Sequence, residues 1–149
     1  MPVIHRSALL PLPVHRVFDV VSDVARYPEF LPWCRDARVL EEGDAELVAE
    51  LQLDAPGMRQ RFTTRNVMRP FQRIELHLVS GPFRTFEGVW HFKRLGGDMG
   101  CRVELDLRFE LSGARGLIGN AFSGLFVSAA DQMVDAFCRR AAELDNGHA

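Results

Sequence analysis

The side chains best suited to bind a charged partner lie between residues 58 and 73, in the stretch MRQRFTTRNVMRPFQR. This stretch carries several arginines and no acidic residue. Alternate residues of an extended strand point to the same face, so Arg59, Arg61 and Arg65 would share one face of a strand. Such a face could contact the phosphates of RNA or of anionic lipid headgroups. The alternative is an ordinary solvated face whose arginines pair with acidic residues of neighbouring strands, namely Glu50, Glu75 or Glu87.

Side chains that often carry out catalysis or bind metals are present but form no recognisable motif. No HxH or HExxH spacing occurs among the histidines, which argues against a metal site. Cys34, Cys101 and Cys138 are far apart and lack a CxxC pair, so we expect neither a disulfide framework nor a zinc knuckle, and a reducing compartment is indicated. We find no inward-facing acid–base pair, and therefore predict that the protein is not an enzyme and requires no cofactor.

The composition and charge of the chain are those of an ordinary globular protein. Its 149 residues, of which 47% are hydrophobic and 26% charged, predict one domain over residues 1–149. The net charge of −2 gives no global reason to expect nucleic acid or membrane binding. The longest uncharged run, residues 116–130, is shorter than the ~20 residues that span a bilayer, and the N-terminus does not resemble a signal peptide. We therefore expect a cytoplasmic protein whose membrane contact is at most peripheral, at the inner membrane face.

Hydrophobic periodicity predicts the elements that would position these residues. A first strand is expected at 3–10, and a helix begins after Pro13 with an apolar stripe at helical spacing: Val14, Val17, Phe18, Val21 and Val24. Period-two patterns then predict a hairpin and four further strands, over residues 38–42 with 45–54, 58–68, 73–79, 83–95 and 101–111. The last of these strands alternates perfectly between apolar and charged residues, which is typical of an antiparallel sheet with one buried face. A helix of about 30 residues follows it.

One long helix must then cover the apolar face of six to seven strands. A helix is ~10 Å wide and strands are ~4.8 Å apart, so the sheet has to curl around the helix, and this favours a gap between them. The apolar segment YPEFLPWC, residues 27–34, contains two prolines that prevent a regular helix or central strand. It either caps the core or lines the mouth of such a cavity, and the two roles are compatible.

Four sequence strings occur in an order that resembles one known family: DVARYPEFLPWC (23–34), FTTRN (62–66), LVSGPFRTFEGVWHF (78–92) and MVDAF (133–137). Together with the order of elements, they resemble the START-like, helix-grip superfamily, and within it the branch that unites coenzyme Q-binding proteins with the ribosome association toxin RatA. The resemblance implies an α+β, START-like (Bet v 1-like, polyketide cyclase-like) fold. In this fold a curved antiparallel sheet wraps the C-terminal helix around an apolar pocket, with a shorter helix after the first strand.

The resemblance implies two roles, between which the sequence does not choose by itself. Our first expectation is non-enzymatic binding of ubiquinone or another polyprenyl quinone, in support of cellular respiration. The alternative is a RatA-like toxin that binds the large ribosomal subunit, blocks subunit joining and so inhibits translation, with the arginine face on ribosomal RNA. A third class, an enzyme that cyclises polyketides, is disfavoured because we find no acid–base pair.

Inward-facing residues of the expected sheet and helices would line the pocket of this fold. We predict that the ligand contacts the following side chains: Tyr27, Phe30, Leu31, Trp33, Phe62, Leu76, Leu78, Phe83, Phe86, Trp90, Leu107, Phe109, Phe122 and Phe126. Gly88 on the inward face would leave a gap, while residues 27–34 and the turn 81–83 would act as lids. The alternative is that the apolar side chains simply pack together and leave no cavity.

Three polar residues fall on the same face as Phe62, namely Gln60, Thr64 and Asn66. A few polar groups in an apolar pocket could hydrogen-bond the carbonyl groups of a quinone. The alternative is that this part of the strand faces solvent at the edge of the sheet.

Overall fold

The computed structural model describes residues 3–55, 58–97, 99–111 and 116–147, with the side chains of all but 55, 58, 111, 116–123 and 146–147. In chain order the elements are β1 (Val3–Leu10), α1 (Val14–Ser22), the 3-10 helix η1 (Val24–Glu29), β2 (Cys34–Glu42), β3 (Glu46–Ala55), β4 (Met58–Arg69), β5 (Arg73–Ser80), β6 (Phe83–Leu95), β7 (Gly100–Leu111) and α2 (Gly116–Gly147). The expected order of strand, helix, antiparallel strands and long helix is confirmed.

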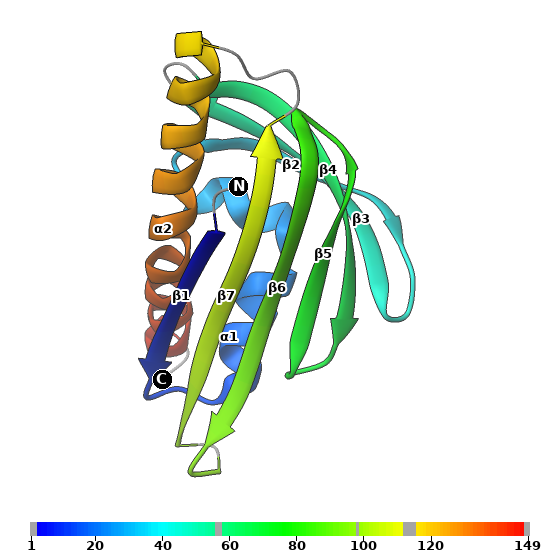
Figure 1. Cartoon of the computed structure of the whole chain (residues 1–149). Coiled ribbons are helices and arrows are strands. Elements are labelled where there is room, and N and C mark those ends of the chain that lie inside the picture. Colours follow the sequence, from blue (N-terminus) through cyan, green and yellow to red (C-terminus); the bar gives the residue numbers. More distant parts are fainter. Residues whose placement is uncertain (1–2, 56–57, 98, 112–115, 148–149) are drawn as a thin grey trace.

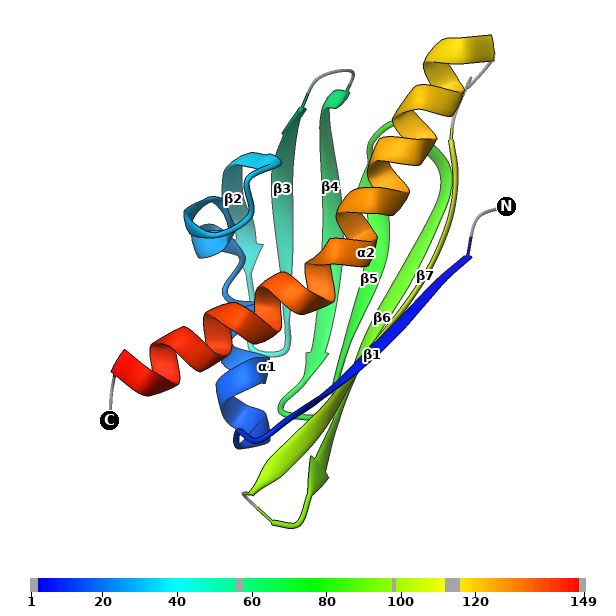
Figure 2. The same ribbon diagram turned by 90° about the vertical axis from the view of Figure 1, so that its left-hand side faces the viewer.

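The seven strands of the described residues form one antiparallel sheet in the order β1-β7-β6-β5-β4-β3-β2. Strands β2 to β7 therefore follow one another as a meander, and β1 joins the edge beside β7. The sheet is strongly curved and α2 crosses its concave face, with α1 beside the C-terminal half of α2 (Figures 1 and 2). The predicted helix-grip arrangement is confirmed.

Apolar side chains of the concave face and of the helices form two core clusters. The first cluster joins α1, η1 and the C-terminal half of α2, and contains Val17, Trp90 and Phe137. The second, here called the phenylalanine cluster, contains rings from three strands and from α2: Phe62, Phe83, Phe86, Phe109 and Phe126. Strand β7 contributes to both clusters, because its apolar residues from Cys101 to Phe109 are buried while Arg102 and Arg108 remain exposed.

Strand β2 is longer than the sequence pattern predicted. The prediction begins the strand at residue 38, whereas the strand begins at Cys34. Its register against β3 shifts between Cys34 and Asp36 and again between Val39 and Glu41. Such bulges add a residue on one strand and interrupt its period-two pattern, so only the end of β2 was visible in the sequence.

Candidate functional site

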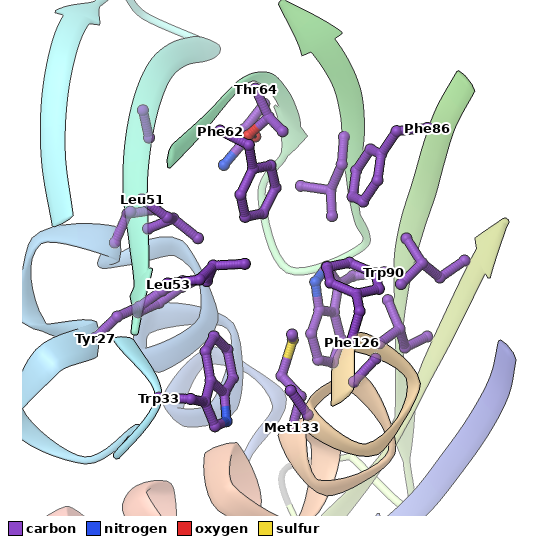
Figure 3. A pocket seen from close by; sticks show the side chains of 18 residues that line it. Tyr27, Trp33, Leu51, Leu53, Phe62, Thr64, Phe86, Trp90, Phe126 and Met133 are labelled. Atoms are coloured by element: carbon purple, nitrogen blue, oxygen red, sulfur yellow. The ribbon is translucent and has the colours of Figure 1, made fainter. Parts of the chain in front are cut away.

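A cavity of about 70 Å³ lies between the concave face of the sheet and α2, where the two core clusters meet. Figure 3 shows the rings of Phe62, Phe86 and Trp90 opposite Leu51 and Leu53, with other walls from α2 and from the segment around η1. The lining residues are Val24, Tyr27, Trp33, Ala49, Leu51, Leu53, Phe62, Thr64, Asn66, Leu76, Phe86, Trp90, Leu105, Leu107, Phe126, Ala129, Ala130 and Met133.

The cavity brings together predicted contact residues from distant parts of the sequence. Those that line it are Tyr27, Trp33, Phe62, Leu76, Phe86, Trp90, Leu107 and Phe126. Other predicted contacts pack in the adjacent core instead of along the cavity wall: Phe30, Leu31, Leu78, Phe83 and Phe109. Sequence parity shows which face of a strand a residue occupies but not how deep it lies beneath α2, which explains why these side chains do not reach the cavity wall. The side chain of Phe122 lies outside the described residues.

One whole wall of the cavity was missing from the predicted contacts. Strand β3 contributes Ala49, Leu51 and Leu53 to the lining, and α2 contributes Met133. The alternation of apolar residues along β3 was the signal that could have found this wall, because it predicts that these side chains share a face. The helical apolar stripe gives the same information for Met133.

Gly88 does not open a gap in the wall, contrary to the prediction. A Cβ atom at Gly88 would lie 3.0 Å from Cδ1 of Leu76 and 3.0 Å from Cδ1 of Leu107, so these two side chains already fill the space. The cavity is also well below the 300–1,000 Å³ of ordinary ligand sites. A quinone head therefore needs the lining side chains to move, and the flexible, unbranched side chain of Met133 is suited to such adjustment.

Two buried polar side chains form a polar corner in this apolar cavity. The Thr64 hydroxyl donates a hydrogen bond of 2.8 Å to Oδ1 of Asn66, and the two residues are 7% and 6% exposed. The third predicted polar residue, Gln60, is exposed and does not line the cavity. The polar corner therefore consists of Thr64 and Asn66, and the solvent-edge alternative holds for Gln60 alone.

The segment at residues 27–34 contributes side chains both to the core and to the lining of the cavity. Tyr27 and Trp33 line the cavity, whereas Leu31 is buried in the first core cluster and Phe30 packs against it. The phenol of Tyr27 donates a hydrogen bond to the backbone carbonyl of Val21. Burial, with smaller effects of Cys34 and Asp23, raises the pKa of this phenol, so Tyr27 remains a neutral donor rather than a base.

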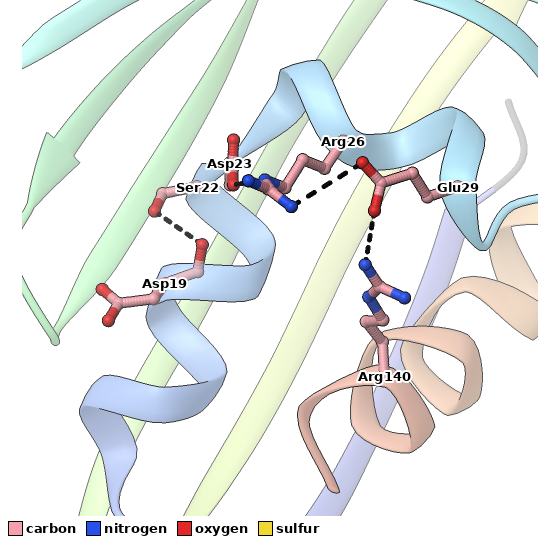
Figure 4. Close-up of polar contacts among 6 residues, drawn as sticks. All are labelled: Asp19, Ser22, Asp23, Arg26, Glu29 and Arg140. Carbon is pink, nitrogen blue, oxygen red and sulfur yellow. Dashed lines mark hydrogen bonds and ion pairs between the residues drawn. The ribbon is translucent and has the colours of Figure 1, made fainter. Parts of the chain in front are cut away.

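Arg140 of α2 clamps η1 onto the long helix through two contacts. Its Nη2 lies 2.5 Å from Oε1 of Glu29, and its guanidinium carbon lies 5.3 Å from the centre of the Phe30 ring. Arg26 extends this chain of charges, because it contacts both Asp23 and Glu29 (Figure 4). The segment around η1 is therefore held against α2 by polar contacts at the surface as well as by the rings of Tyr27 and Phe30.

The second predicted lid, the turn at residues 81–83, lies directly against a lining residue. A Cβ atom at Gly81 would lie 2.6 Å from the Cβ of Phe62, so only glycine allows the turn to approach so closely. Phe83 completes this contact with its ring centre 5.7 Å from that of Phe62. The turn therefore packs directly against the phenylalanine cluster.

The predicted arginine face lies on the outer face of the sheet and is partly paired. Arg59 contacts Asp54 at 3.2 Å and Arg65 contacts Glu46 at 2.9 Å, while Arg61 has no ion-pair partner among the described residues. None of the predicted partners Glu50, Glu75 and Glu87 pairs with these three arginines, because the acids that do so lie near the ends of β3. Glu75 instead pairs with Arg73 of the same stretch, at 3.5 Å. All three arginines remain exposed, with the Arg59 side chain at 85%.

Two of the cysteine thiols have markedly raised pKa values. Burial is the main cause that raises the pKa of the Cys34 thiol to about 11 and that of the Cys138 thiol to about 12, so both are protonated at neutral pH.

No group of three potential ligand residues that could hold a metal ion is found among the residues described. None of the described helices is both long and apolar enough to cross a membrane.

A curved antiparallel sheet that grips a long helix around an apolar cavity defines a START-like, Bet v 1-like protein. The chain belongs to the family described as polyketide cyclase / dehydrase and lipid transport, whose profile matches residues 10–138. Solved structures agree with this fold. A Thermus thermophilus protein superimposes with a TM-score of 0.81 at 20% identity, covering 96% of this chain and 99% of its own. A Streptomyces aromatase/cyclase superimposes with a TM-score of 0.65 at 22% identity, covering 97% and 88%.

Curated relatives narrow the comparison within this family. The ribosome association toxin RatA of Pseudomonas aeruginosa is 50% identical over 95% of this chain and 96% of its own length. RatA of Escherichia coli is 39% identical over 97% of this chain and 89% of its own. A mitochondrial coenzyme Q-binding protein homolog of Xenopus laevis is 27% identical over 93% of this chain and 57% of its own. The predicted family resemblance is confirmed.

Proposed function

We propose that this protein associates with the large ribosomal subunit, blocks the joining of the subunits and so inhibits translation. The observation that carries this proposal is the 50% identity to a ribosome association toxin across almost the whole of both chains. The coenzyme Q-binding relative is 27% identical, so ribosome association ranks above quinone binding, which the sequence had put first. A cytoplasmic location follows from this function.

The exposed arginines on the outer face of β4 support a contact with ribosomal RNA. Guanidinium groups bind phosphate oxygens in a two-pronged geometry. The ion pairs of Arg59 and Arg65 are exposed, and exposed pairs contribute little stability. An RNA phosphate can therefore replace Asp54 or Glu46 at small cost.

Sucrose-gradient profiles of a bacterial translation extract test this proposal. Purified protein added in excess over ribosomes should lower the peak of joined ribosomes, raise the peaks of free subunits and reduce synthesis of a reporter protein. Protein inactivated by heat serves as the control. An unchanged profile with unchanged reporter synthesis would contradict the proposal.

A second function, the binding of a hydrophobic molecule in the cavity, is supported by the cavity itself. Burial of apolar ligand surface would contribute roughly 25 cal/mol per Å², and the relative named for coenzyme Q binding favours a polyprenyl quinone such as ubiquinone. The ligand would be held without chemical change, because the lining described here contains no Asp, Glu, His, Lys, Arg or Cys. A long isoprenoid tail would extend beyond so small a cavity.

Organic extraction of the gently purified protein, followed by mass spectrometry, tests the second function. Protein from quinone-producing cells should release quinone in stoichiometric amount. Ala129→Leu, which adds three carbon atoms to a lining residue of α2, should abolish this, whereas Ser128→Leu at the neighbouring exposed position should not. Equal quinone in all three proteins would contradict binding in the cavity.

A further inference from the structure

Asn66 is an unusual residue for the wall of an apolar cavity. It lies on β4 between Leu47 of β3 and Leu76 of β5 and is 6% exposed. Its Oδ1 accepts the hydrogen bond from Thr64. Among the residues that the structure describes, no group accepts a hydrogen bond from its Nδ2. The cavity therefore contains one amide whose oxygen is occupied and whose donors are available.

The Thr64 hydroxyl determines which end of this amide faces the cavity. A threonine hydroxyl has one proton, and here it is donated to the amide oxygen. The NH2 group of the amide, Nδ2, is thereby left to donate a hydrogen bond to whatever occupies the cavity. No fully buried side-chain nitrogen or oxygen among the described residues lacks a hydrogen-bond partner, so Nδ2 keeps accessible surface through which water or a ligand can accept its hydrogen bond. Leucine has the same heavy-atom connectivity as asparagine and would fill this position without needing such a partner.

The surroundings of Asn66 restrict the ligand further. Aromatic side chains line the same cavity, among them Phe62, Phe86 and Trp90, and flat walls of this kind suit a planar ring. No Lys, Arg or His lines the cavity in the described part of the chain, so a carboxylate would be buried without a counter-charge, which is costly. A planar, neutral ring fits the flat apolar walls and needs no counter-charge. An oxygen on this ring can accept the hydrogen bond from Asn66.

We propose that Asn66, oriented by Thr64, is the residue that recognises a carbonyl oxygen on a planar, uncharged, apolar ligand. This inference rests on the proposed ligand-binding function, and it adds to that function the class of ligand that the cavity selects. The site should prefer quinones and other neutral ring ketones to hydrocarbons of the same size and to fatty acids. Asn66 supplies the hydrogen bond, and Thr64 acts on the ligand through Asn66.

Calorimetric titration with three probes tests this selectivity. The first is a dimethoxy-methyl-1,4-benzoquinone with a decyl tail, the second is the decyl dimethoxytoluene without carbonyl groups, and the third is decanoate. The wild-type protein should bind the quinone most tightly. Asn66→Leu should weaken quinone binding about tenfold, as expected for one hydrogen bond, and leave the affinity for the toluene analogue unchanged or higher.

A pair of neighbouring threonines provides the matched control. Thr64→Val should weaken quinone binding a few-fold through loss of the amide orientation, whereas Thr63→Val should not, because Thr63 is equally buried but does not line the cavity. The fluorescence of Trp33 and Trp90 reports occupancy independently, since these are the two tryptophans of the chain and both line the cavity.

Two results would overturn the inference while leaving the ligand-binding function intact. One is quinone affinity that is unchanged in Asn66→Leu, and the other is an equal loss of affinity for the quinone and for the toluene analogue. If the wild-type protein binds neither compound, the ligand-binding function itself is contradicted, and the role of Asn66 with it. Thermal unfolding of each variant separates these results from loss of the fold.

Discussion

At the scale of single residues, Phe109 illustrates how the phenylalanine cluster joins the sheet to α2. Its side chain is completely buried, and its ring centre lies 4.7 Å from that of Phe126 and 5.9 Å from that of Phe83. Phe109→Ala should therefore lower the free energy of unfolding by about 3–5 kcal/mol, as measured by urea denaturation. Val79→Ala, at an exposed position of β5, should lower it by less than about 1 kcal/mol. Equal effects of the two changes would contradict this description of the core.

The buried thiols give a second prediction at the residue scale. Thiolate, not thiol, is the reactive form, so a raised pKa slows modification at a given pH. At pH 8 the pKa of about 11 for Cys34 leaves about one thiolate in a thousand, roughly two hundredfold fewer than for an ordinary thiol with a pKa near 8.5. Reaction of the native protein with a chromogenic disulfide at pH 8 should be slow, and should become rapid in denaturant. Rapid modification of Cys34 in the native protein would contradict its buried position.

At the scale of elements, Arg140 holds the predicted lid, residues 27–34, against α2 through Glu29 and Phe30. Arg140→Met removes both the pair with Glu29 and the contact with Phe30, while Arg139→Met changes an exposed neighbour on the same helix. An exposed ion pair and a cation–π contact are each worth about 1 kcal/mol or less, so Arg140→Met should loosen the lid without unfolding the protein. Hydrogen exchange of a peptide spanning residues 24–34 should become faster in Arg140→Met and remain unchanged in Arg139→Met. Equal exchange in both variants would show that buried rings alone hold the lid.

The elements also show what sequence periodicity can and cannot predict. The perfect alternation of residues 101–111 predicted β7 and its buried face, because period two is a direct consequence of strand geometry. The bulges of β2 and the space beside Gly88 were not predictable, because both depend on the register and on the size of side chains from neighbouring strands. The same limit separates Phe62, which lines the cavity, from Phe109, which faces the same way but packs beneath α2.

At the scale of the whole molecule, the two faces of the curved sheet carry different features. The concave face and α2 enclose the cavity, whereas Arg59, Arg61 and Arg65 project from the outer face of β4. A ribosome bound at the outer face would therefore leave the cavity free, and a ligand in the cavity would leave the arginines free. Strand β4 contributes side chains to both faces of the sheet. Thr64 and Asn66 line the cavity, and the arginines at alternate positions point outward.

The most direct test of ribosome association through this outer face is the binding of purified large ribosomal subunits at 50 and 200 mM salt. The wild-type protein should co-sediment with the subunits at low salt. If three arginines release counterions from phosphates, its affinity should fall roughly 20- to 40-fold at the higher salt. Changing Arg59, Arg61 and Arg65 together to Glu should abolish co-sedimentation. The same change in net charge elsewhere on the outer face, at Lys93, Arg102 and Arg108, should reduce it much less. No binding by the wild-type protein would contradict ribosome association, and equal loss in the two triple variants would contradict the arginine contact.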